Sequence, residues 1–299
     1  MKMPWPELDY KAAKETYDTL HLWTQIVGKI KLSKLPWVNH SWHVTLTVTP
    51  SGLSTSAIIT ENENFQIDFD LINHQLEIIC GSGEKRGFAL QGLSVAEFYY
   101  QVKDSLAELD IEININEMPN EIQNAISFPQ DHEHKTYELN HAEALHKALI
   151  NSQAALLNFR AKFNGKCSPI HFFWGSFDLA VSRFSGRSAP MHPGGVPNLP
   201  DRVAQEAYSH EVSSAGFWPG NEMVPFAAFY SYIYPEPAGF KEAKISPAEA
   251  YYDKTLGEYI LPYAVVQQAE NPGEILMQFL QTTYEAAANA AHWDREMLE

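Results

Sequence analysis

The chain has 299 residues, of which 45% are hydrophobic and 12% aromatic, so it can bury a dense core as one large domain or two smaller ones. Only 19% of the residues are charged, below the usual ~25%, which excludes a largely disordered chain. The 37 acidic and 21 basic residues give a net charge of −16, so we expect neither a nucleic-acid nor an anionic-membrane partner.

The first residues contain no apolar core or cleavage site typical of a secretory signal. No stretch reaches the ~18 apolar residues of a membrane span. Cys80 and Cys167 are the only cysteines, and we expect both to be reduced rather than joined in a disulfide. The sequence therefore predicts a cytoplasmic protein.

Helices are predicted by apolar residues at helical spacing and by capping signatures. The first helix carries Leu20, Trp23, Val27 and Ile30 on one side and should end before Pro36. An oxygen-bearing cap followed three residues later by glutamate is typical of a helix start, because each side chain accepts from the other residue's backbone N–H. Four such pairs occur, at Ser94 and Glu97, Asn140 and Glu143, Ser246 and Glu249, and Asn271 and Glu274. Apolar stripes continue from the first, second and fourth pairs to Leu109, Phe163 and Ala287.

Alternating residues predict strands in both halves. In the first half they lie at residues 42–49, 65–69, 76–80 and 111–115. In the second half they lie at residues 170–184, 207–214 and 226–234, before the helices expected from Ser246 and Asn271. Short connections favour antiparallel pairing. We therefore predict an α+β fold with mainly antiparallel sheets and flanking helices, as two similar lobes (residues 1–128 and 129–299) or, alternatively, one continuous domain.

Residues 167–234 are unusually rich in aromatic, histidine, arginine and turn residues, and we expect the functional site in this C-terminal half. Strand alternation places Asp178 on one face and Arg183 on the other. Arg183 either forms a structural ion pair or, with Arg187, binds a carboxylate or phosphate through its planar guanidinium.

Three histidines join Asp178 as candidates for proton transfer. His171 lies in the aromatic run before Asp178. His192 lies in the proline- and glycine-rich stretch 184–200, which is either a binding loop or a plain covering loop. His210 is either a hydrogen-bonded structural residue or a ligand or base.

Aromatic residues could hold the apolar part of a ligand. Trp174 and Trp218 offer flat surfaces. Tyr230 and Tyr232 share one face of a predicted strand and line either a pocket or an exposed sheet.

Several cofactor and nucleophile motifs do not occur. The sequence has no Walker loop, dinucleotide fingerprint, Gly-x-Ser-x-Gly elbow or His-Glu-x-x-His motif. We therefore expect no nucleotide cofactor. A metal ion held by His132 and His134, by His40 and His43, or by converging histidines of the second half is the less favoured interpretation, and we assign no metal ligands.

Several blocks together resemble a known family. They include His171-Phe-Phe-Trp-Gly-Ser-Phe-Asp178, residues 209–220 with Gly216-Phe-Trp-Pro-Gly220, residues 229–237, and Trp37-Val-Asn-His-Ser-Trp-His43. The chain resembles the DUF5996 family of uncharacterised bacterial proteins over nearly its whole length. The resemblance implies a bacterial, cytoplasmic protein and carries no activity, substrate or catalytic set.

Two hypotheses follow from the residues. The first is a small-molecule-binding protein, in its stronger form an enzyme, acting on a polar or anionic ligand in a cleft of the C-terminal half. The alternative is a non-catalytic interaction module that uses the Trp-, Tyr- and Arg-rich blocks as an interface. The sequence does not indicate the oligomeric state.

Overall fold

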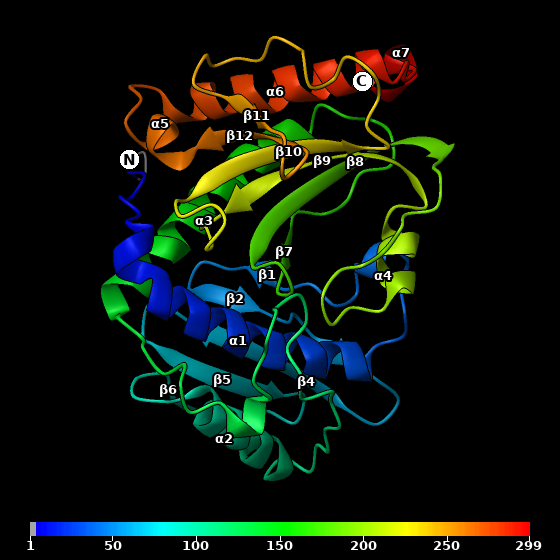
Figure 1. The fold of residues 1–299 in the computed structure, drawn as a ribbon. Helices are drawn as coiled ribbons and strands as arrows, with labels where there is room; N and C mark the ends of the chain where they lie inside the picture. The colour runs from blue at the N-terminus through cyan, green and yellow to red at the C-terminus, as the bar shows by residue number, and fades with distance from the viewer. Residues whose placement is uncertain (1–3) are drawn as a thin grey trace.

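The computed structural model describes residues 4–299 and confirms the α+β prediction (Figure 1). Within this range, seven α-helices flank two antiparallel sheets, one formed by the first half of the chain and one by the second. The two sheets lie in separate parts of the molecule, with helix α1 (Tyr10–Lys34) beside the N-terminal sheet.

The N-terminal sheet has the order β1-β2-β4-β5-β6, with β3 paired to β4. Its strands are β1 (Thr47–Val48), β2 (Gly52–Ser54), β3 (Ile58–Ile59), β4 (Asn64–Asp70), β5 (Gln75–Cys80) and β6 (Lys85–Ala89). As the alternation predicts, Phe65, Ile67 and Phe69 are buried and their neighbours are more exposed.

Helices α1 and α2 (Val95–Ala107) cover the apolar side of this sheet. The Trp23 ring stacks on Phe98 with centroids 4.9 Å apart, and Phe98 stacks in turn on Phe69 at 5.9 Å. The capping box predicted at Ser94 and Glu97 is present and begins α2. The predicted end of α1 before Pro36 is also confirmed.

The C-terminal sheet has the order β11-β12-β10-β9-β8-β7. Its strands are β7 (His171–Phe173), β8 (Asp178–Ser188), β9 (His210–Trp218), β10 (Ala228–Tyr234), β11 (Tyr251–Asp253) and β12 (Glu258–Pro262). Helices α3 (Leu139–Arg160) and α6 (Pro272–Ala290) pack on one face of this sheet (Figure 1). The short helices are α4 (Asp201–Ala207), α5 (Tyr263–Gln267) and α7 (Arg295–Leu298).

The register of this sheet sorts its residues onto two faces. Leu179, Val181 and Arg183 point toward the helices and are buried. On the other face, Ala180 pairs with Gly216 and Gly216 with Tyr230, while Ser182 pairs with Ser214 and Ser214 with Tyr232. This second face is lined by small and hydroxyl-bearing residues, so it leaves room beside it.

The two sheets meet at one edge. Leu46 and Phe172 exchange backbone hydrogen bonds of 2.9 and 3.0 Å, which joins the segment before β1 to β7. The main buried cluster also contains residues from both halves of the chain, among them Trp23 and Phe229. The division into lobes at residue 128 stays a prediction.

Several predicted elements are wrong in detail. No helix begins at Ser246, because residues 251–262 form the β11–β12 hairpin that extends the sheet beside β10. Helix α3 begins at Leu139 with no side-chain cap, so Asn140 is not its cap. Asn271 does precede α6, but its side chain makes no capping bond.

Four predicted strands are divided, shortened or absent. The strand predicted at residues 170–184 is divided by a turn into β7 and β8, which pair with each other. Of residues 42–49 only Thr47–Val48 forms a strand, since the chain turns after the 3₁₀ helix Asn39–Ser41. Residues 111–115 join no sheet. The strand expected from residue 207 begins at His210, because α4 occupies the preceding residues.

Candidate functional site

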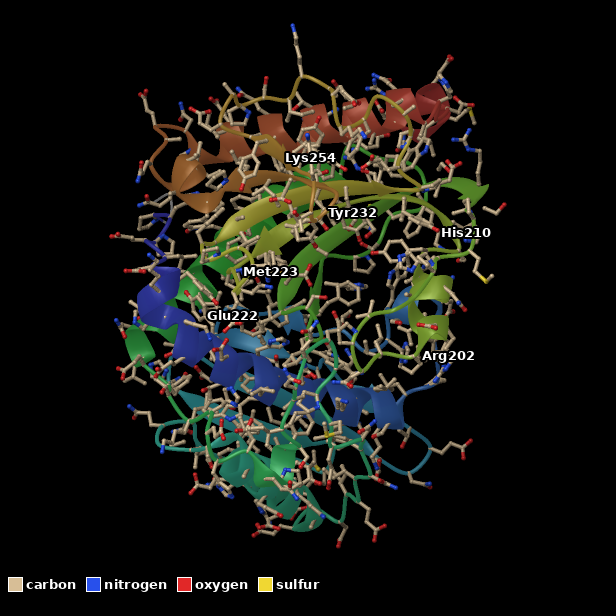
Figure 2. All side chains as sticks on the ribbon, in the orientation of Figure 1. Arg202, His210, Glu222, Met223, Tyr232 and Lys254 are labelled. Carbon is tan, nitrogen blue, oxygen red and sulfur yellow. The ribbon has the colours of Figure 1, made fainter. Side chains whose placement is uncertain are left out.

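A cavity of about 560 Å³ lies against the open face of the C-terminal sheet. Its floor is formed by β8, β9 and β10. Its walls are α1, residues 37–44, residues 114–121, the β7–β8 turn and residues 196–208. Figure 2 shows Tyr232 in the middle of the C-terminal sheet, on the strand that contributes two tyrosines to this floor. The volume is in the range of small-molecule sites in proteins.

Four of the residues predicted from the sequence line the cavity: Trp174, Asp178, Tyr230 and Tyr232. They come from the β7–β8 turn, the start of β8 and one face of β10. The sequence predicted that the face of Tyr230 and Tyr232 lines either a pocket or an exposed sheet. In the structure this face lines the cavity.

Trp174 is positioned by a notch in helix α1. A Cβ at Gly28 would lie 2.2 Å from the Trp174 ring, so only glycine allows the indole to approach this closely. The indole Nε1 donates to the Val44 carbonyl at 2.8 Å. Trp174 is therefore a fixed wall of the cavity, 6% exposed.

Asp178 and Tyr230 form the central polar pair. The Tyr230 hydroxyl donates to Asp178 Oδ2. Gly216 makes this arrangement possible, since a Cβ there would lie 2.5 Å from the Tyr230 oxygen. Burial is the main cause that raises the pKa of Asp178 to about 7, and the Glu121 charge raises it further, against the lowering effect of the Tyr230 bond. Burial and the Asp178 charge raise the pKa of Tyr230 well above its ordinary value, so the tyrosine stays protonated.

A second hydroxyl pair lies beside the first. Tyr208 and Tyr232 share a hydrogen bond of 2.8 Å, and the Tyr230 and Tyr232 rings stack with centroids 6.1 Å apart. Across the floor, the Ser182 and Ser214 hydroxyls are 3.0 Å apart. The floor therefore offers several hydroxyl groups in a row, suited to hydrogen-bond a polar molecule.

Glu121 contributes a second carboxyl group from a loop far away in sequence. Its Oε2 accepts from Ser176 Oγ at 2.9 Å, and burial raises its pKa. Its φ of 62° lies in the left-handed region, as do those of His40 (59°) and Ser41 (56°), which also line the cavity. Such strain costs about 1–3 kcal/mol per residue and is concentrated at functional sites.

Arg183 does not reach the cavity. It points to the opposite face of β8, is 1% exposed, and places its guanidinium carbon 3.5 Å from the Phe159 ring centroid and 4.3 Å from that of Tyr284. Its Nη2 donates to the Phe159 carbonyl. Aromatic rings therefore surround the Arg183 guanidinium, in place of the carboxylate or ligand anion that the sequence suggested.

Arg187 and His210 lie outside the cavity as well. Arg187 pairs with Glu211 at 2.6 Å and donates to the Ala291 carbonyl at 2.6 Å. His210 is exposed at the start of β9, toward the edge of the molecule (Figure 2), and its Nδ1 lies 3.1 Å from Ser209 Oγ. The anion clamp expected from Arg183 and Arg187 is not assembled.

The other predicted candidates lie near the cavity without lining it. His192 stacks on the Tyr208 ring at 4.7 Å and accepts from the Gly194 N–H. His171 is buried beside Trp42, and burial lowers its pKa to about 4. Trp218 is half-buried at the end of β9. The three histidines therefore do not converge.

The structure adds cavity residues that the sequence reasoning missed. They come mainly from the first half and include Lys29, Trp37, His40, Ser41 and Glu121, with Arg202 from α4. The block 37–43 was marked only by the family resemblance and by the less favoured metal pair of His40 and His43, and nothing local marks Lys29 or Glu121. The buried Ser41 hydroxyl has no hydrogen-bond partner among the described residues, which is unusual for a polar group in a folded protein.

Residues 196–208, which form one wall of the cavity, are hydrogen-bonded to the N-terminal half near both of their ends. The Pro197 carbonyl accepts from the Glu121 N–H at 2.8 Å, and the Trp37 indole donates to Glu206. His40 Nδ1 lies 3.0 Å from the Ala207 carbonyl. Of the stretch 184–200, predicted as either a binding or a covering loop, the last residues line the cavity, and Pro197 joins it to the N-terminal half.

Residues 4–299 contain no group of three or more His, Cys, Asp or Glu side chains arranged to hold a metal ion. In the same range, no helix is both long and apolar enough to cross a membrane.

Comparison with known proteins places the chain in a family without assigning an activity. Neither a curated protein nor a solved structure matches it. A family model described as a family of unknown function (DUF5996) matches residues 5–299, essentially the whole chain. The protein therefore belongs to the DUF5996 family, as the aromatic blocks of its sequence suggested.

Proposed function

We propose that the protein binds a small polar molecule in the cavity on the open face of the C-terminal sheet. The observation that carries the proposal is a space of about 560 Å³ lined by Asp178, which is 8% exposed and forms no ion pair with any side chain of residues 4–299. Burying an unpaired carboxyl group destabilises a fold, so its presence at a cavity wall indicates a role toward a ligand.

Asp178 is also the group that would transfer protons if the bound molecule is transformed. With a pKa of about 7, both of its protonation states are populated near neutral pH. Tyr230 orients the carboxyl group through Oδ2. Of the four acid–base candidates named from the sequence, Asp178 is the one that lines the cavity, so we propose it rather than the three histidines.

The surroundings support a ligand with polar groups and an apolar or ring portion. Trp174 and Phe173 provide flat apolar walls, while Tyr232, Ser182 and Ser214 provide hydroxyls. The hypothesis of an interaction module has less support, because Trp174 is buried within the chain and cannot serve as an interface anchor.

A cavity-filling variant tests the proposal. Ser182 lies half-buried on the cavity floor, so Ser182→Leu should fill the space where the ligand would lie. Ser82→Leu, at an exposed turn, is the matched control. Native mass spectrometry of the purified protein and thermal-shift screening of a metabolite library should reveal a ligand that raises the Tm of the parent and of Ser82→Leu.

The same ligand should leave the Tm of Ser182→Leu unchanged. Equal stabilisation of Ser182→Leu would place the ligand elsewhere. A parent protein that retains no small molecule and responds to no compound in the library would contradict the proposed function itself.

A further inference from the structure

We propose that the side of the cavity formed by Asp178 and Glu121 binds the ammonium group of a protonated amine, whose apolar or ring portion lies against the aromatic walls. This inference rests on the proposed function, because it names the chemical class of the molecule that the cavity holds.

Two carboxyl groups line this cavity, and neither has a cationic partner among residues 4–299. Asp178 accepts from Tyr230 and Glu121 accepts from Ser176, both neutral hydroxyl donors. Neither carboxyl group takes part in an ion pair within the described chain. A bound ammonium group would supply the missing positive charge and donate up to three hydrogen bonds.

The cationic side chains of the cavity are engaged elsewhere. Lys29 Nζ donates to the Met118 carbonyl at 2.7 Å and lies 5.8 Å from the Phe128 ring. The Arg202 guanidinium lies 5.5 Å from the Trp37 ring, on the exposed side of α4, toward the edge of the molecule (Figure 2). Their charges therefore leave Asp178 and Glu121 unneutralised.

Aromatic rings near the carboxyl groups add a second reason for a cation. Tyr230 and Tyr232 present stacked rings on the floor, and Trp174 forms the wall beside Glu121's partner Ser176. The faces of such rings attract organic cations, with about 0.5–2 kcal/mol for each good contact. Asp178 itself is more than nine-tenths buried and lines the cavity, so the charge it lacks can be supplied only from within that space.

The ionisation of these groups sets the expected pH dependence. The groups around Asp178 are Tyr230 and Tyr232 on β10, Tyr208 after α4, Glu258 on β12 and Glu121; the cavity also contains Lys29, Arg202 and His40. Burial raises the pKa of Asp178 to about 7 and that of Glu258 to about 8, while the tyrosines stay neutral. The carboxylate of Asp178 therefore forms as the pH rises through 7, and amine binding should strengthen over the same interval.

Three probes with the same 4-hydroxyphenyl ring but different charges distinguish the effect of ligand charge on binding from the effect of ligand shape. They are tyramine (cationic), 4-ethylphenol (neutral) and 3-(4-hydroxyphenyl)propionate (anionic), each titrated into the full-length protein by calorimetry. At pH 8 we expect tyramine to bind at least about tenfold more tightly than the other two. Its affinity should fall by about tenfold or more between pH 8 and pH 5.5, as Asp178 becomes protonated.

Isosteric variants identify the carboxyl groups. Asp178→Asn and Glu121→Gln should each weaken tyramine by about tenfold and leave 4-ethylphenol unchanged. Asp104→Asn and Glu61→Gln, at exposed positions outside the cavity, are the matched controls and should behave as the parent.

The outcomes are distinct. Equal binding of tyramine and 4-ethylphenol, preference for the propionate, or no tyramine binding overturns the amine inference. A ligand found by the Ser182→Leu comparison that is neutral or anionic would overturn it too, while leaving the proposed cavity function intact.

Discussion

Strand β8 buries a charged side chain on each of its two faces, and the surroundings of the two differ. Arg183 points into the packed side, where the rings of Phe159 and Tyr284 enclose it. Asp178 points into the cavity, where Tyr230 is its hydrogen-bond partner. Both side chains are less than 10% exposed, so burial alone does not separate a structural charge from a functional one.

What separates them is whether the protein itself stabilises the charge. Burial lowers the pKa of Arg183 only to about 10, so it stays charged at neutral pH among its aromatic partners. Burial raises the pKa of Asp178 to about 7, so its charge is poorly supported by the fold. A charge stabilised within the packed side holds the structure together, whereas a poorly stabilised charge beside a cavity indicates a site.

The largest expected effect is the pH dependence of stability at Asp178. Its carboxyl group has a raised pKa when folded, so its contribution to stability is full below its ordinary value near 3.8 and is lost as the pH rises through about 7. The complete change corresponds to about 4 kcal/mol. Asp178→Asn should therefore gain stability over the parent between pH 4 and pH 8, as urea unfolding can measure.

Asp104→Asn serves as the control for this measurement, because Asp104 is exposed on α2. A difference between Asp178→Asn and the parent that does not change with pH would show that Asp178 ionises as readily in the fold as in water.

The next effect tests the packed side. Arg183→Ala should lower the free energy of unfolding by about 3 kcal/mol, because it leaves a space among Phe159, Phe163 and Tyr284. Urea unfolding measures the loss of stability. Calorimetry at a temperature where the variant stays folded should show that tyramine binds as it does to the parent. Normal stability together with lost binding would reverse the roles assigned to the two faces.

The smallest effect is expected at Arg187. Its side chain is 49% exposed, and its pair with Glu211 lies at the surface. Arg187→Ala should therefore cost less than about 1 kcal/mol in urea unfolding and leave cavity binding unchanged. Loss of ligand binding in this variant would restore the anion-binding role that the sequence suggested.

Much of the fold was predictable because its signals are local. The stripe of Leu20, Trp23 and Val27 predicted α1, and the alternation of Phe65 and Ile67 predicted β4. Local signals failed where tertiary pairing favoured another structure. The capping signature at Ser246 predicted a helix, but the following residues form the β11–β12 hairpin, because it extends the sheet beside β10.

The site was predictable only in part. Alternation correctly separated Asp178 from Arg183, yet it could not tell which face would be packed by helices. Tyr230 and Tyr232 were recognised as a shared face, whereas Glu121 was missed because no pattern in its loop links it to Ser176.

The sequence by itself determined the amphipathic helices and strands, and hence the α+β class, because periodicity along the chain decides which side of each element is apolar. Only the tertiary structure decided where the cavity lies and which charges face it. The walls of the cavity are set where segments distant in the chain meet in close contact, as Gly28 does with Trp174 and Gly175 does with Glu121. That outcome depends on side-chain shapes meeting across the fold, which no local pattern records.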